Sequence, residues 1–120
     1  MKVIYIAHSR DFDFKHDLYK PIRNSALNSQ HKIIFPHETD QFINSKAIIK
    51  RSQLVIAEVS HSAIGVGIEL GWANSFNVPI LCLYKEGSNL SKSLEAVAGT
   101  IVPYASVEEM LIKLESFLSQ

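Results

Sequence analysis

The sequence contains little cysteine, glycine or proline, and it has no long apolar segment. One cysteine, five glycines and four prolines among 120 residues exclude a disulfide-rich, collagen-like or low-complexity chain. No apolar run approaches the roughly 20 residues of a membrane span, and residues 1–7 are too short for a signal peptide. We therefore expect one globular domain over residues 1–120, located in the cytoplasm, with no membrane partner.

The chain also has no excess charge of either sign. Twelve basic residues balance twelve acidic ones, so there is no positive field to hold nucleic acid. The five histidines form no i, i+4 pair and have no cysteine nearby, so the sequence predicts no metal site and no cofactor. Cys82 lies in an apolar run, where a thiol is typically a small core residue.

What the sequence does contain is an alternation of β-branched runs and amphipathic helical patterns. The predicted strands are residues 2–7, 32–35, 54–59, 79–84 and 100–102. Helices are predicted over residues 13–28, 40–52 and 64–76, near Ser91, and after Ser106, which begins a capping box with Glu109. Mostly apolar strands separated by helices favour a five-stranded parallel sheet covered on both faces, in a flavodoxin-like or Rossmann-like α/β fold.

Polar residues follow the predicted strands, where a ligand is expected in such a sheet. His8, Ser9 and Arg10 follow the first strand, and Glu58 ends the third. The next segment, residues 57–73, holds Gly65, Gly67 and Gly71 around the start of a helix, with Glu69 expected in its first turn. Glycines there would admit a ligand close to the backbone, and a helix N-terminus would favour the ionised carboxylate. The alternative is that Glu69 only complements the helix dipole.

Residues 57–73 resemble the signature A-E-V-(S/T)-x-x-S-x-G-V-G-x-E-L-G-x-A of the nucleoside 2-deoxyribosyltransferase family, in particular its 2'-deoxynucleoside 5'-phosphate N-hydrolase branch. Ala63 stands where that branch has serine. The resemblance implies a flavodoxin-like homodimer that cleaves the N-glycosidic bond of a nucleoside or nucleoside 5'-monophosphate, by hydrolysis or by deoxyribosyl transfer. It implies Glu69 as the nucleophile and Tyr5 as the residue that orients it. The implied substrate-binding residues are His8, Ser9, Arg10, Glu58, Ser62, Gly65, Gly67 and Ser93.

Some of these residues also have a purely structural interpretation. Glu58 can serve as a hydrogen-bonding scaffold for its loop, and Tyr5 can be a packing residue. Ser93 follows Ser91, which can cap a short helix, whereas in the family a serine here reaches the phosphate in the neighbouring subunit's site. We expect Trp72 in the core or at a dimer interface.

The chain departs from the family pattern at Ser45, where the family has an aspartate that supports proton transfer to the leaving base. A serine is a poor general acid, so the proton would come from His37, Glu38 or Asp40, or the chemistry is lost. The loop after the first strand also lacks the family's glycines and adds two acidic residues. The second hypothesis is therefore a catalytically silent nucleotide-binding module, and a third is a flavin-type binding domain.

Overall fold

The computed structural model describes residues 1–120 and contains five parallel strands in one sheet, in the order β2-β1-β3-β4-β5. The strands are β1 (Val3–His8), β2 (Lys32–Ile34), β3 (Leu54–Glu58), β4 (Ile80–Lys85) and β5 (Thr100–Tyr104). All five lie within two residues of their predicted positions. This strand order is the flavodoxin-like one, so the predicted fold class is confirmed.

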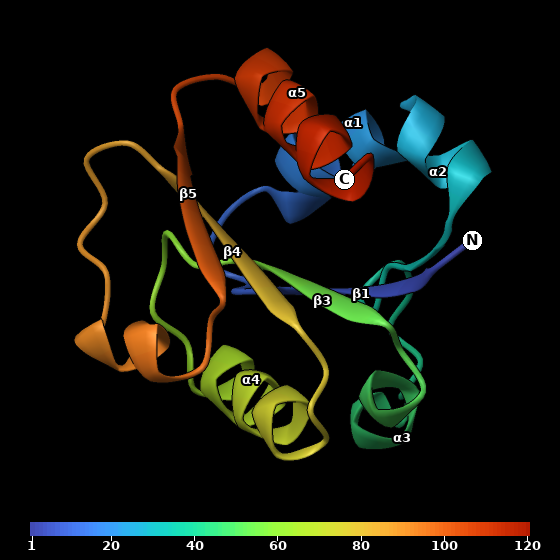
Figure 1. Cartoon of the computed structure of the whole chain (residues 1–120), viewed down its shortest axis with the longest axis vertical. Coiled ribbons are helices and arrows are strands. Elements are labelled where there is room, and N and C mark those ends of the chain that lie inside the picture. The colour runs from blue at the N-terminus through green and yellow to red at the C-terminus, as the bar shows by residue number, and fades with distance from the viewer.

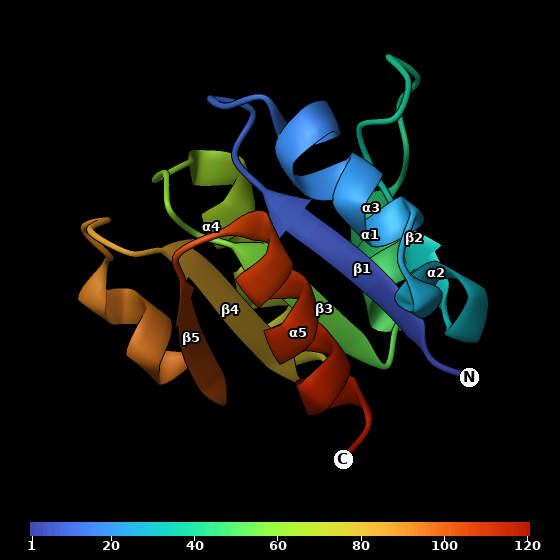
Figure 2. The ribbon, with the colours of Figure 1, turned by 90° about the horizontal axis from the view of Figure 1, so that it is seen from above.

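Helices cover both faces of the sheet (Figure 1). The helices are α1 (Lys20–Arg23), α2 (Ala26–Gln30), α3 (Ser45–Lys50), α4 (Ile64–Ser75) and α5 (Val107–Leu118). Figures 1 and 2 show α1, α2 and α5 on one face and α3 and α4 on the other. A short 3₁₀ helix, Lys92–Ala96, precedes β5.

Two apolar clusters fill the two sides of the sheet. Alternate β1 residues point to opposite sides, so Ile4 and Ile6 belong to the cluster under α1 and α5, which includes Met110. Tyr5 and Ala7 belong to the cluster under α3 and α4. The second cluster includes Cys82, which is fully buried, and burial raises the pKa of its thiol to about 11. The predicted core position of this cysteine is confirmed.

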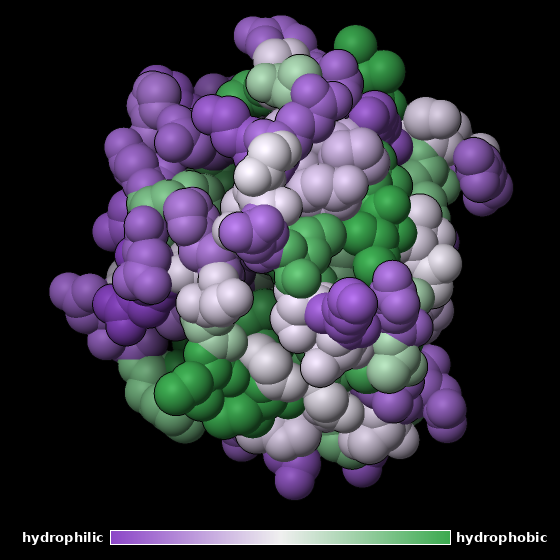
Figure 3. Space-filling model, turned by 90° about the vertical axis from the view of Figure 1, so that its left-hand side faces the viewer, coloured by the Kyte–Doolittle hydropathy of each residue, from purple (hydrophilic) through white to green (hydrophobic).

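The strand order places a topological switch point between β1 and β3. The chain leaves β1 toward β2 on one side and later returns to β3 on the other, so the loops that follow β1 and β3 diverge. Their last residues, His8 and Glu58, are partners in the parallel register. Figure 3 looks onto this edge and shows apolar patches between its hydrophilic side chains.

The helix predicted over residues 13–28 is divided into a π-helical turn, Lys15–Tyr19, followed by α1 and α2. Pro21 has no N–H to donate to the preceding turn, which disfavours continuous α-helix there. Ser25 then begins α2, with its hydroxyl oxygen accepting from the Leu27 N–H. The helix predicted over residues 40–52 is shorter as well, because Asn44 caps α3.

The predicted helix starts near the C-terminal third are confirmed. Ser91 caps the 3₁₀ helix by accepting from the Ser93 N–H. Ser106 caps α5 by accepting from the Glu109 N–H over 3.2 Å, while the Glu109 carboxylate accepts from the Ala105 N–H rather than from Ser106. None of the helices combines the length and apolarity required to span a lipid bilayer.

The end of α4 yields a stability prediction. Asn77 has a positive φ of 59°, and the next residue, Val78, donates its N–H to the Ala73 carbonyl, which closes the helix. The left-handed conformation costs a residue with a Cβ about 1–2 kcal/mol, less for asparagine and nothing for glycine. We predict that Asn77→Ala lowers the free energy of unfolding by about 1 kcal/mol in urea titrations, whereas Asn77→Gly leaves it equal or higher. Equal losses in both variants would contradict this account.

Candidate active site

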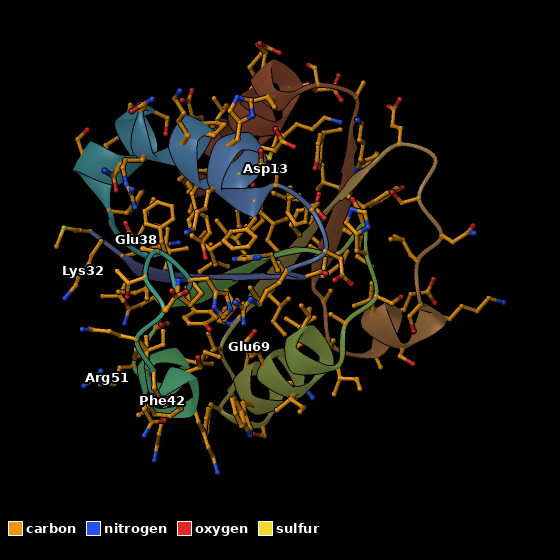
Figure 4. The ribbon with its side chains drawn as sticks, turned by 180° about the vertical axis from the view of Figure 1, so that it is seen from behind. Asp13, Lys32, Glu38, Phe42, Arg51 and Glu69 are labelled. Atoms are coloured by element: carbon orange, nitrogen blue, oxygen red, sulfur yellow. The ribbon has the colours of Figure 1, made fainter.

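The centre of the site is the Glu69 carboxylate, which projects from α4 toward the sheet (Figure 4). The hydroxyl of Tyr5, a fully buried residue in the middle of β1, hydrogen-bonds to this carboxylate. The same hydroxyl lies 2.9 Å from Ser45 Oγ at the start of α3. A phenol has one proton, so it donates to Glu69 and accepts from Ser45. The contact joins β1, α3 and α4 at one point.

Glu69 lies in the second turn of α4 and not in its first turn, which corrects the expectation from the sequence. The helix begins at Ile64, because Ala63 is its extended N-cap residue, so Gly65 and Gly67 are helical. The helix N-terminus therefore does not hold the carboxylate ionised. Burial raises the pKa of Glu69 above its usual value of 4.5, while hydrogen bonds with Tyr5 and Ser45 oppose that rise.

A cavity of about 480 Å³ opens beside Glu69. The loop after β1 contributes His8, Ser9, Arg10 and Asp11 to its wall, and the start of α4 contributes Gly65. A Cβ built on Gly65 would meet nothing within 4 Å, so the helix backbone is open to the cavity there. The cavity therefore combines a half-buried carboxylate with positive charge at the carboxyl end of β1.

His8 is buried in a fixed hydrogen-bond network. Its Nδ1 lies 2.8 Å from the Ser9 carbonyl oxygen, so this nitrogen carries the proton and donates it. Its Nε2 therefore accepts from the Tyr19 hydroxyl over 2.6 Å, and that hydroxyl accepts from the backbone N–H of His37. Burial lowers the pKa of His8 to about 4, so the imidazole is neutral near pH 7. This histidine stabilises the wall of the cavity.

Aromatic rings connect the loops around the cavity. Phe12 in the loop after β1 stacks on His61 in the loop after β3, with ring centroids 5.3 Å apart. Phe14 lies 4.5 Å from His8 between ring centroids. The contact between Phe12 and His61 holds the two diverging loops of the switch point against each other.

The predicted substrate-binding residues divide among three cavities. His8, Ser9, Arg10 and Gly65 line the cavity of Glu69. Ser62, Gly67 and Ser93 line a second cavity of about 480 Å³ between α4 and the 3₁₀ helix. Glu58 lines a smaller cavity beside β5. One chain therefore brings only four of the eight residues to Glu69.

Glu58 is fully occupied by hydrogen bonds within the protein. Its carboxylate accepts from the Ser60 N–H over 2.6 Å, from the Ser60 hydroxyl over 3.0 Å and from the Tyr104 hydroxyl. Ser60 Oγ in turn accepts from the Lys85 N–H. These contacts tie the ends of β3, β4 and β5 together, which is the scaffold role considered for this residue.

Several cavity residues were not expected from the sequence. Ser45 was predicted only as the substitute for an aspartate, but it contacts the Tyr5 hydroxyl directly. Trp72 is half-buried and lines the cavity, and Phe42, in the segment before α3, is 91 % exposed at its rim (Figure 4). An aromatic residue directly after the polar run Thr39-Asp40-Gln41 was the available signal for Phe42.

Comparison with known proteins identifies relatives of this chain. No protein-family model matches the chain. The chain is 37% identical over 92 residues to the mouse 5-hydroxymethyl-dUMP N-hydrolase, covering 68% of this chain and 53% of that protein. It is also 35% identical over 75 residues to a Syntrophotalea carbinolica protein that is named as a 2'-deoxynucleoside 5'-phosphate N-hydrolase. That match covers 60% of this chain and 53% of the other protein. The chain is related to these N-hydrolases. The resemblance predicted from the sequence is thereby confirmed.

The chain spans about half the length of these curated relatives. Among solved structures, the CMP N-glycosidase of Clostridium botulinum matches with a TM-score of 0.69 at 22% identity, over 95% of this chain and 99% of that one. A conserved protein of Enterococcus faecalis matches with a TM-score of 0.63 at 18% identity, over 98% and 99% of the two chains. At these identities the structural likeness establishes that this chain shares the fold of the two solved proteins.

The buried His8 makes the stability depend on pH. The folded protein binds a proton at His8 only near pH 4, whereas the unfolded chain binds it near pH 6.5. Between these values the unfolded state holds more protons, so acidification favours unfolding. We predict that His8→Gln flattens the loss of stability between pH 6.5 and 4 in urea titrations, while His16→Gln, at an exposed position, does not. An unchanged pH slope in His8→Gln would contradict the network.

The hydrogen bond from Tyr5 should influence the pKa of Glu69. This bond stabilises the charged carboxylate, so its removal should raise the pKa of Glu69 further. We predict a higher titration midpoint for the Glu69 carboxyl carbon in Tyr5→Phe, measured by NMR. The matched control is Tyr104→Phe, which removes a hydroxyl bonded to Glu58 instead. A lower midpoint in Tyr5→Phe, or equal shifts in both variants, would refute the assignment.

Proposed function

We propose that this chain cleaves the N-glycosidic bond of a deoxyribonucleoside or its 5'-monophosphate, with the Glu69 carboxylate as the nucleophile. One observation supports this most directly. Glu69 is a half-buried carboxylate that faces a cavity at the switch point of the sheet, and it accepts a hydrogen bond from the buried Tyr5 hydroxyl, which also contacts Ser45. A carboxylate that only complemented a helix dipole would need neither the cavity nor these partners.

The proposed chemistry has two steps. A Glu69 oxygen forms a bond to C1' of the sugar while the bond from C1' to the base nitrogen breaks, and its electron pair leaves with the base. Water then attacks C1', and the bond to Glu69 breaks with its electron pair returning to the carboxylate. One water proton stays on the new C1' hydroxyl, and the other neutralises the departed base. Tyr5 is a positioning residue in this scheme, because it lies beneath Glu69 with no exposed surface.

The other end of the substrate would lie against the loop after β1. Arg10 is exposed there and lines the cavity, and the Ser9 hydroxyl oxygen accepts from the Asp11 N–H, which leaves its own proton free to donate. A guanidinium and a hydroxyl suit a 5'-phosphate. The names of the curated relatives, which include a 5'-phosphate N-hydrolase, support this choice of substrate.

The homodimer and deoxyribosyl transfer to a second base stay predictions. Ser93 and Ser62 line the second cavity and not the cavity of Glu69. Any contact of Ser93 with the same nucleotide would therefore require a second copy of the chain. A silent nucleotide-binding module is the second candidate function, and Ser45 is the observation that favours it.

The proposal is tested by incubating the protein with deoxyribonucleosides and their 5'-monophosphates and measuring free base by chromatography. We predict base release that falls by roughly 10³-fold or more in Glu69→Gln, because the amide is not a nucleophile. Glu108→Gln, an exposed position on α5, serves as the control and should release base at the wild-type rate. Release that persists in Glu69→Gln would refute the nucleophile, and nucleotide binding without release would favour the silent module.

A further inference from the structure

The cavity beside Glu69 has no group suited to donate a proton to a departing base. Ordinary nucleobases leave as poorly stabilised anions unless an acid protonates them, and a positioned general acid contributes about 10²–10⁴-fold to such a step. The sequence suggested three side chains that could supply this proton in place of an aspartate at position 45, namely His37, Glu38 and Asp40.

Two of those three alternatives do not reach the cavity. Glu38 forms an ion pair with Arg23, beside α1, and lines a different cavity with it. Figure 4 shows Glu38 well apart from Glu69. Asp40 lies in the exposed segment before α3 and does not line the cavity of Glu69. Neither carboxyl group is therefore placed to protonate a base bound next to Glu69.

The histidines of the cavity are poorly suited to donate a proton. Both ring nitrogens of His8 are engaged by the Ser9 carbonyl and the Tyr19 hydroxyl. His37 lines the cavity, but burial and the neighbouring Arg10 lower its pKa below the ordinary 6.5. A lowered pKa reduces the fraction of the imidazole that carries a proton to donate.

The remaining polar groups also fail as acids. The Tyr5 hydroxyl is committed to Glu69, and burial together with the Glu69 charge raises its pKa. Ser45, 2.9 Å from the Tyr5 hydroxyl, offers only a hydroxyl, which is a poor general acid. Asp11 is exposed on the same loop as Arg10, on the side of the cavity where the proposed function places the 5'-phosphate and not the base. Arg10 and Lys46 supply positive charge, which suits a phosphate.

The cavity does provide aromatic surfaces for a base. Trp72 forms part of its wall and Phe42 stands almost fully exposed at its rim. The face of an aromatic ring attracts a cation, by about 0.5–1 kcal/mol at exposed sites and more when water is excluded. A base that already carries a positive charge would gain from these rings and would also need no acid.

From this arrangement we infer that the substrates are nucleotides whose base is already positively charged, such as ring-N-alkylated purine deoxynucleotides. This inference rests on the proposed function of Glu69. In the reaction, Glu69 bonds to C1', the bond from C1' to N9 breaks, and its electron pair neutralises the charge on the purine. The base leaves as a neutral molecule, and no proton donor or other reactant is required in that step.

The test compares 7-methyl-2'-deoxyguanosine 5'-monophosphate with 2'-deoxyguanosine 5'-monophosphate as substrates, after subtracting the rate of spontaneous depurination. We expect kcat/KM at least about 100-fold higher for the methylated nucleotide, since the missing acid is worth that much. Glu69→Gln should remove the release from both. Equal, Glu69-dependent release from both nucleotides would overturn the inference and leave the proposed function standing. No Glu69-dependent release from either would overturn both.

A second variant tests whether the missing acid is the cause. Ser45→Asp introduces a carboxyl group beside Tyr5 and Glu69, so we expect faster release from the unmethylated nucleotide and a smaller preference for the methylated one. Ser45→Asn is the matched control, because its amide occupies the same position and nearly the same volume as the aspartate but cannot act as a general acid. A preference that falls equally in both variants, with folding verified by circular dichroism, would contradict the assignment.

Discussion

The site depends on the contact between a strand tyrosine and a helix carboxylate. Tyr5 belongs to the apolar cluster between the sheet and α4, yet its hydroxyl reaches Glu69 and Ser45. Burial raises the pKa of Glu69, and the hydrogen bonds with Tyr5 and Ser45 oppose that rise. The same contact fixes α3 and α4 relative to β1. The hydrogen-bonded group of Tyr5, Ser45 and Glu69 thus links the apolar cluster beneath α4 to the site above it.

A second set of contacts holds the loops of the edge. Glu58 joins the ends of β3, β4 and β5, while the network of His8, Tyr19 and His37 holds the loop after β1. Glu58, His8 and Tyr19 are buried, and no buried polar side chain of the protein lacks a hydrogen-bond partner, which makes the edge rigid. A rigid edge suits a site whose nucleophile must lie within a few tenths of an ångström of its target.

Much of the fold could be predicted from the sequence, because the strands are short, apolar and β-branched and the helices have clear caps. The breaks in the helix over residues 13–28 could not be predicted from the apolar pattern, because they are caused by Pro21 at the start of α1 and by Ser25, which caps α2. Glu69 could be singled out as a candidate from its motif, but neither its position in the second turn of α4 nor the direction of its pKa shift could be predicted. Those follow from the burial that α3 and β1 provide. The division of the predicted binding residues among three cavities likewise depends on tertiary packing.

The most direct test of the account is to detect the covalent intermediate on Glu69. A 2'-fluoro-substituted nucleotide should slow the attack of water on the intermediate more than it slows release of the base, so the intermediate should accumulate. After acid quenching and proteolysis, mass spectrometry should find the sugar phosphate on the peptide that contains Glu69. Complete base release with no adduct, or with an adduct on another residue, would contradict Glu69 as the nucleophile.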